Sequence, residues 1–103
     1  MFWYRRDMIR SFRNSGTADI AKGVNSKTSR TILPVSLHRK ARRKIAEIDF
    51  AASLQDLRYP GNRLHVLTAD RAGQYSVSIN DQYRICFRWV EGEVFNVEIV
   101  DYH

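Results

Sequence analysis

The second half of the chain alternates apolar and polar residues, and this pattern constrains the fold more than any other feature. In residues 74–79, 82–89 and 95–99, every second side chain is large and apolar. Successive side chains of a β-strand point to opposite faces, so a period of two predicts strands with one buried face. Asn80–Asp81 and Glu91–Gly92 separate these runs and suit tight hairpin turns. We therefore expect an antiparallel meander.

A helical period precedes this meander. Between Pro34 and residue 50, Leu37, Ala41, Ile45 and Ile48 recur three or four residues apart and form one apolar stripe. Pro34 is tolerated in a first helical turn, because the N–H that it lacks would be unpaired there. An amphipathic helix over residues 34–50 is therefore predicted.

Shorter segments complete the predicted fold. Residues 64–68 and 8–12 are expected to be strands, the latter at an edge, and residues 53–57 a helical turn. Residues 14–31 are rich in Ser, Thr, Asn and Gly and predict a loop, with at most a short helix near residues 17–22. The predicted class is α+β: a small antiparallel sheet of four to five strands packed against two or three N-terminal helices.

The length of the chain, 103 residues, leaves room for a single domain. We expect this domain over residues 8–103, preceded by an N-terminal extension over residues 1–7. Cys86 is the single cysteine and has no partner for an internal disulfide, which favours a reducing compartment. No apolar run approaches the roughly 20 residues that cross a bilayer. A cytoplasmic location and no membrane partner are expected.

Positive charge is concentrated in the first half of the chain. Residues 1–50 carry a net charge of +8, whereas residues 51–103 carry −2. The densest cluster lies on the predicted helix, and such a cluster attracts nucleic-acid phosphates whatever the base sequence. A solvated helix face fits the pattern equally well. The cations of this cluster are Arg39, Lys40, Arg42, Arg43 and Lys44.

The histidines are the first candidates for acid–base chemistry near neutral pH. His38 fits a solvated helix surface, while His65 lies in a predicted strand and His103 ends an apolar strand. Arg84 and Arg88 fall on the polar face of their strand, opposite the apolar side chains. No cysteine pair, no i, i+4 histidine pair and no glycine-rich phosphate loop occurs, so neither zinc nor a nucleotide cofactor is expected. The sequence does not decide whether the polar groups meet.

Several motifs together resemble the HigB toxins, which belong to the RelE-like superfamily of type II toxin–antitoxin systems. The resemblance covers residues 8–103 and implies a RelE-like fold. The motifs occur in the family's order and separation. They are Met8–Phe12, Leu64–Leu67, Asp70–Val77 with its Gly-Gln-Tyr-Ser-Val, Tyr83–Trp89, and the closing Asp101-Tyr102-His103.

The resemblance implies a ribosome-dependent endoribonuclease that cuts translated mRNA in the ribosomal A site without a metal or other cofactor. Attack by a ribose 2′-hydroxyl on the adjacent phosphate needs a base, a charge stabiliser and an acid. By position, His65, Asp101 and His103 match the family's acid–base residues and Arg84 its phosphate-stabilising arginine. Tyr102 matches a residue that orients substrate, and Arg71 a basic residue near the scissile phosphate. Further RNA contacts are expected from Arg39, Lys40, Arg42, Arg43 and Arg88.

The same resemblance implies a HigA-like helix-turn-helix antitoxin, through which the complex would bind operator DNA, and the 70S ribosome and mRNA as targets. One departure is that Thr68-Ala69 stands where family members commonly have Lys-Gly, so a cation is missing. Two alternatives therefore stay open. One is a catalytically weak inhibitor that binds the ribosome or RNA, and the other is a gyrase-inhibiting relative of the same fold, against which the terminal Asp101-Tyr102-His103 argues.

Overall fold

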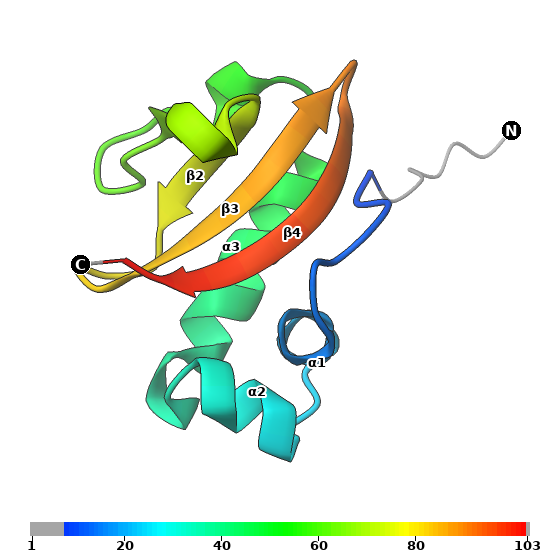
Figure 1. The fold of residues 1–103 in the computed structure, drawn as a ribbon, viewed down its shortest axis with the longest axis vertical. Coiled ribbons are helices and arrows are strands. Elements are labelled where there is room, and N and C mark those ends of the chain that lie inside the picture. The colour runs from blue at the N-terminus through cyan, green and yellow to red at the C-terminus, as the bar shows by residue number, and fades with distance from the viewer. Residues whose placement is uncertain (1–7, 103) are drawn as a thin grey trace, which may run out of the picture.

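The computed structural model describes residues 8–102. The predicted extension over residues 1–7 and the predicted catalytic residue His103 lie outside this range. Three α-helices precede a four-stranded antiparallel sheet, which confirms the α+β class (Figure 1). No helix within residues 8–102 is long and apolar enough to cross a bilayer.

The sheet is the predicted meander, with strand order β1-β2-β3-β4. At the β2–β3 turn, the Asn80 side chain accepts hydrogen bonds from the backbone N–H groups of Gln82 and Tyr83, at 2.9 and 2.8 Å. At the next turn, Glu91 and Gly92 have φ values of 50° and 83°, as a tight hairpin requires. The strands are β1 (His65–Val66), β2 (Gln74–Ser78), β3 (Tyr83–Val90) and β4 (Glu93–Asp101).

A bulge in β4 corrects the predicted pattern of its apolar face. Asn96 adopts a φ of 57°, and the pairing register between β3 and β4 shifts by one residue beside it. Because a one-residue shift moves side chains to the other face, Phe95 pairs with Arg88 on the outer face instead of following Val97 inward. Val94, which is fully buried, takes the inward position.

The edge segment Met8–Phe12 is not a full strand. It lies beside β4 through two isolated parallel bridges, from Ile9 to Val94 and from Phe12 to Val97. The carboxylate of Asp49 accepts hydrogen bonds from the backbone N–H groups of Met8 and Ile9, both at 2.8 Å. The Asp49 side chain thus binds the N–H groups of these two residues, while the Met8 carbonyl accepts from the N–H of Val94 at 2.9 Å.

The prediction for residues 14–31 is confirmed for the short helix, which is α1 (Ser15–Lys22), but the loop predicted after it is wrong, because α2 (Lys27–Ile32) forms there. The polar residues that suggested a loop are helix caps. Asn14 accepts from the N–H of Thr17, Ser26 and Ser29 form a capping box, and Gly23 ends α1 at a φ of 77°. Polar composition here marks helix ends, not an absence of structure.

The predicted long helix is present as a short 3-10 turn, Val35–Leu37, followed by α3 (His38–Phe50). Its apolar stripe packs on the inner face of the sheet, and α3 crosses behind the sheet in Figure 1. The inner-face Phe87 is fully buried and stacks on Tyr75, with ring centroids 6.2 Å apart. The predicted turn near residue 55 is Leu54–Leu57, capped by Ser53 and Asp56. None of the α-helices within residues 8–102 covers the opposite face of the sheet, which we call the outer face.

Candidate functional site

The strand register aligns four side chains in one row across the outer face. His65 of β1 pairs with Ser76 of β2, Ser76 with Cys86 of β3, and Cys86 with Glu98 of β4. Cross-strand neighbours point to the same face of a sheet. The row therefore joins a predicted catalytic histidine to residues of all four strands.

A hollow of about 410 Å³ lies over this row. It brings together three of the predicted site residues, which come from three different parts of the chain: His65, Arg71 and Tyr102. Thr68, the residue in the place of the family lysine, also lines it. The complete lining is His65, Val66, Leu67, Thr68, Asp70, Arg71, Cys86 and Tyr102.

Arg84 lies on the polar face of its strand, as predicted, but it is buried, since only 6% of it is exposed. Its Nε donates to the Ser76 hydroxyl at 2.8 Å, and its Nη2 donates to the carbonyls of Ser76, at 3.2 Å, and Arg63. Burial lowers the pKa of Arg84, and the charge of Arg63 lowers it further. Within residues 8–102, Nη1 has no hydrogen-bond partner. The guanidinium is held from one side and keeps donors for a ligand.

Tyr102 connects Arg84 to the hollow. The guanidinium carbon of Arg84 lies 5.9 Å from the centre of the Tyr102 ring, and Tyr102 itself is 56% exposed. A cation at this distance attracts the ring face and so orients the tyrosine. Ser76 gives a second connection, because it pairs with His65 and accepts from Arg84.

Sequence reasoning missed Glu98. The Arg71 guanidinium donates from Nη1 to Glu98 at 3.2 Å and to the Gln74 side chain at 3.1 Å. Arg71, which is predicted to contact RNA, is therefore already in an ion pair in the free protein. Alternation and the hairpin register could not have placed Glu98 beside Cys86, because without the bulge at Asn96 this register would pair Cys86 with Val97. Burial raises the pKa of the Cys86 thiol, which disfavours the reactive thiolate form.

The strand register places Asp101 apart from two other predicted catalytic residues, His65 and Arg84. Asp101 pairs with Tyr83, whose face is that of Ile85 and Ile99, so its register places it on the inner-face side. The Gln82 amide donates to its two carboxylate oxygens, at 3.3 and 3.2 Å, while the Gln82 carbonyl accepts from the backbone N–H of Tyr102 at 2.6 Å. Gln82 thus holds the end of β4 through two successive residues.

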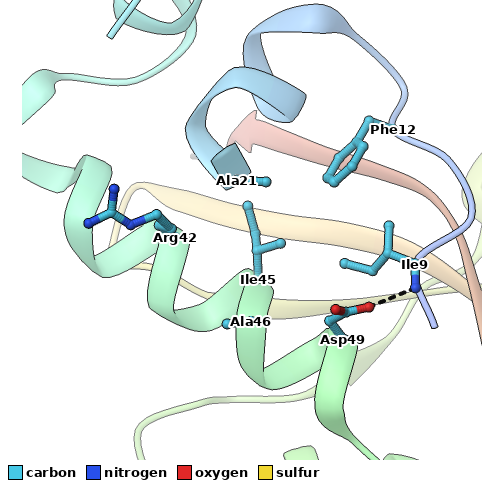
Figure 2. A pocket seen from close by; sticks show the side chains of 7 residues that line it. All are labelled: Ile9, Phe12, Ala21, Arg42, Ile45, Ala46 and Asp49. Atoms are coloured by element: carbon cyan, nitrogen blue, oxygen red, sulfur yellow. Dashed lines mark hydrogen bonds between the residues drawn. The ribbon is translucent and has the colours of Figure 1, made fainter. Parts of the chain in front are cut away.

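The predicted RNA-binding cations fall into two separate regions. Arg88 is exposed on the outer face and pairs with Gln74, whereas Arg39, Lys40, Arg42 and Arg43 are exposed on α3, across the sheet. Arg42 also lines a second hollow of about 220 Å³, between α1, α3 and the edge segment, where Asp49 binds the backbone of Ile9 (Figure 2).

Lys44 does not belong with these exposed cations. It is 6% exposed and binds Asn62 inside the fold, which corrects its assignment to the charged outer surface of the helix. Within residues 8–102, no three His, Cys, Asp or Glu side chains gather closely enough to hold a metal ion.

Comparison with known proteins identifies the family. A family model described as the RelE-like toxin of type II toxin–antitoxin system HigB matches residues 17–103. This chain belongs to that family. The toxin HigB-1 of Vibrio cholerae is 38% identical over 66 residues, which cover 63% of this chain and 70% of that protein. The endoribonuclease HigB of Proteus vulgaris is 29% identical over 97 residues, 93% of this chain and all of that protein.

A solved structure shows the same fold at low sequence identity. It is the YoeB–YefM complex from Staphylococcus aureus, with a TM-score of 0.58 and 16% identity over 96% of this chain and 99% of the matched chain. At this identity the similarity supports the RelE-like fold alone. The catalytic roles of His65, Arg84, Asp101, Tyr102 and His103 stay predictions.

Proposed function

We propose that this HigB-family toxin is a ribosome-dependent mRNA endonuclease that cuts translated mRNA in the A site. The observation that carries the proposal is the outer-face cluster, in which Ser76 joins His65 to the fixed guanidinium of Arg84 beside an open hollow. The name of the Proteus vulgaris relative, an endoribonuclease, supports the same activity.

The geometry suits transesterification at a phosphate. The ribose 2′-hydroxyl loses a proton and attacks the adjacent phosphorus, and the bond to the 5′-oxygen breaks as that oxygen gains a proton. Arg84 offers a fixed positive charge to the phosphate oxygens, which bear extra negative charge in the transition state. His65 is exposed at the hollow, within reach of a proton on a bound ribose. Arg71 would hold the neighbouring backbone.

The chain terminus would supply the remaining groups. Asp101, which faces the other way, would act through Gln82 by fixing the end of β4. Tyr102 is exposed, and its ring would orient a base or ribose over Arg84. His103, the residue that follows, would be the second acid–base group.

Partners follow from the family and from the charge distribution. We propose a HigA-like helix-turn-helix antitoxin that binds this chain, represses activity and carries the complex to operator DNA; the fold neighbour was solved as a complex. The exposed cations of α3 would contact ribosomal RNA phosphates while the outer face takes mRNA. All of these partners are cytoplasmic.

One observation favours a second candidate, a toxin that binds the ribosome and cuts slowly. Thr68 lines the hollow where related toxins carry a lysine, so the site has one cation fewer. The remaining arginines, Arg71 and Arg84, would then carry the whole stabilisation of the phosphate. Slow or absent cleavage with blocked translation would identify this candidate.

The test is mRNA cleavage in a translating bacterial extract, with 5′ ends mapped by primer extension. The arms are the natural chain, His103→Ala, Arg13→Lys as an exposed control outside the site, and a reaction without ribosomes. We expect cuts only with ribosomes, lost in His103→Ala and kept in Arg13→Lys. Intact mRNA with translation still blocked would contradict the nuclease and support the slow binder.

A further inference from the structure

The buried lysine of α3 stands out in the fold. Lys44 donates from Nζ to the Asn62 side chain at 2.6 Å and to the Tyr59 hydroxyl at 3.3 Å, and it lies 5.2 Å from the centre of the Tyr59 ring. Burial lowers its pKa. Within residues 8–102, no carboxylate lies within 4.0 Å of it; the charge of Glu47, which accepts from the Tyr59 hydroxyl, offsets part of the effect of burial on the Lys44 pKa. Burial of a charge whose hydrogen-bond partners are neutral costs free energy, so the position of Lys44 requires an explanation.

Asn62, the main partner of Lys44, fixes a backbone turn. Asn62 is 1% exposed, and its side-chain amide nitrogen donates to the Leu57 carbonyl at 2.6 Å. Its backbone carbonyl accepts from the N–H of Ser78 in β2 at 2.8 Å. The oxygen and the nitrogen of its side chain thus both form hydrogen bonds, one with Lys44 of α3 and the other with the Leu57 carbonyl. The turn cannot shift along β2 without breaking one of these bonds.

The backbone carbonyl of the next residue, Arg63, binds Arg84 in the candidate site. Arg63 has a φ of 48°, in the left-handed region that a residue with a side chain rarely adopts. This conformation directs the Arg63 carbonyl to Nη2 of Arg84. The Arg63 side chain meanwhile binds Asp81 at 2.9 Å and the Ser78 hydroxyl at 3.2 Å, away from the hollow. The turn therefore serves Arg84 through its backbone.

We infer that Lys44 and Asn62 are positioning residues for Arg84: the Lys44–Asn62 bond holds the turn whose Arg63 carbonyl orients the guanidinium toward the scissile phosphate. The inference rests on the proposed function. Ser76 binds two guanidinium nitrogens, Nε and Nη2, but from one residue of β2, so the Arg63 carbonyl is the only acceptor from a second element within residues 8–102. Without the Arg63 carbonyl, the Arg84 guanidinium could rotate about its contacts with Ser76.

The test compares Lys44→Met with Lys27→Met, which removes the same charge from an exposed position of α2. Small errors in the position of a catalytic group are expensive, so we expect Lys44→Met to lower kcat about 10- to 100-fold with KM within about twofold. In an Arg84→Lys background, Lys44→Met is expected to change kcat less than about twofold, because coupled residues are not additive. Lys27→Met is expected to match the natural chain.

A second readout does not need cleavage. In ¹⁵N-labelled protein, the Arg84 Nε–H signal reports the bond to Ser76, and Lys44→Met is expected to speed its exchange with solvent. If the natural chain itself does not cleave mRNA, the proposed function fails and this signal alone decides the positioning role. Should Lys44→Met not fold, Tyr59→Phe removes the second acceptor of Lys44 at a residue that is 40% exposed. This variant is also expected to speed the exchange of the Arg84 Nε–H with solvent.

Equal loss of kcat in both Arg84 backgrounds would overturn the inference, as would a loss confined to KM. A lower melting temperature with an unchanged Arg84 signal would show that Lys44 is only structural.

Discussion

The exposed cations of α3 differ from two arginines of the outer sheet face, Arg71 and Arg84, in how the fold holds them. Within residues 8–102, the exposed α3 group has one ion pair, between Arg43 and Glu47 at 4.0 Å. On the outer face, Arg71 donates to two side chains and Arg84 to three acceptors. The two regions lie on opposite sides of the sheet.

The difference separates attraction from catalysis. Mobile exposed cations attract any polyanion, and their effect weakens with salt as counterions are released. A cation already fixed in the folded state needs no further ordering when charge develops on a phosphate. Counting positive charges in the sequence treats the two alike, although only the second group has a defined geometry.

The largest expected effect is at Arg84. Arg84→Lys keeps the charge but replaces a planar group with several donors by a compact ammonium, which cannot serve three fixed acceptors and a phosphate together. We expect the single-turnover cleavage rate on programmed ribosomes to fall about 10²- to 10³-fold, with its salt dependence unchanged. Thermal melting checks that the variant is folded. A rate within threefold of the natural chain would remove the distinction between fixed and mobile cations.

A smaller, salt-dependent effect is expected on α3. Replacing Arg39, Arg42 and Arg43 with glutamine removes three exposed charges and should reduce the slope of log affinity for ribosomes against log salt by about 2 to 3. Binding is measured by sedimentation at several salt concentrations, with cleavage followed at saturating ribosomes. An unchanged slope would mean that these arginines do not contact phosphates in the complex.

The smallest effect concerns Tyr59, which anchors the one buried cation of α3. Burial, the hydrogen bond to Glu47 and the Glu47 charge raise its pKa from 10.0 to about 12. Since the folded state holds the phenol proton more tightly, this stabilisation is present below pH 10 and is lost as pH rises toward 12. The unfolding free energy of the natural chain relative to Tyr59→Phe should fall over that interval, by no more than about 1 kcal/mol because Tyr59 is 40% exposed. A constant difference, measured by urea denaturation, would contradict the raised pKa.

The candidate site could be foreseen in part. Period-two alternation placed Arg84 and Arg88 on the polar face of their strand, and the observed register puts Asp101 with Ile99 on the opposite face. Glu98 was missed because its place beside Cys86 depends on the bulge at Asn96, and its ion pair joins it to Arg71, which is distant in the chain. Lys44 was misassigned because charge density along a helix does not show which side meets a neighbouring loop.

The sequence alone determined the order of the four sheet strands, the helix that precedes them, the hairpin turns and the family, since each depends on local periodicity or on motifs in a fixed order. Only the tertiary structure decided that Arg84 is buried, that Arg71 begins paired with Glu98, and that the bulge at Asn96 turns Phe95 outward. These outcomes depend on contacts between residues far apart in the chain. Burial, ion pairing and register are properties of neighbours in space, which no local pattern specifies.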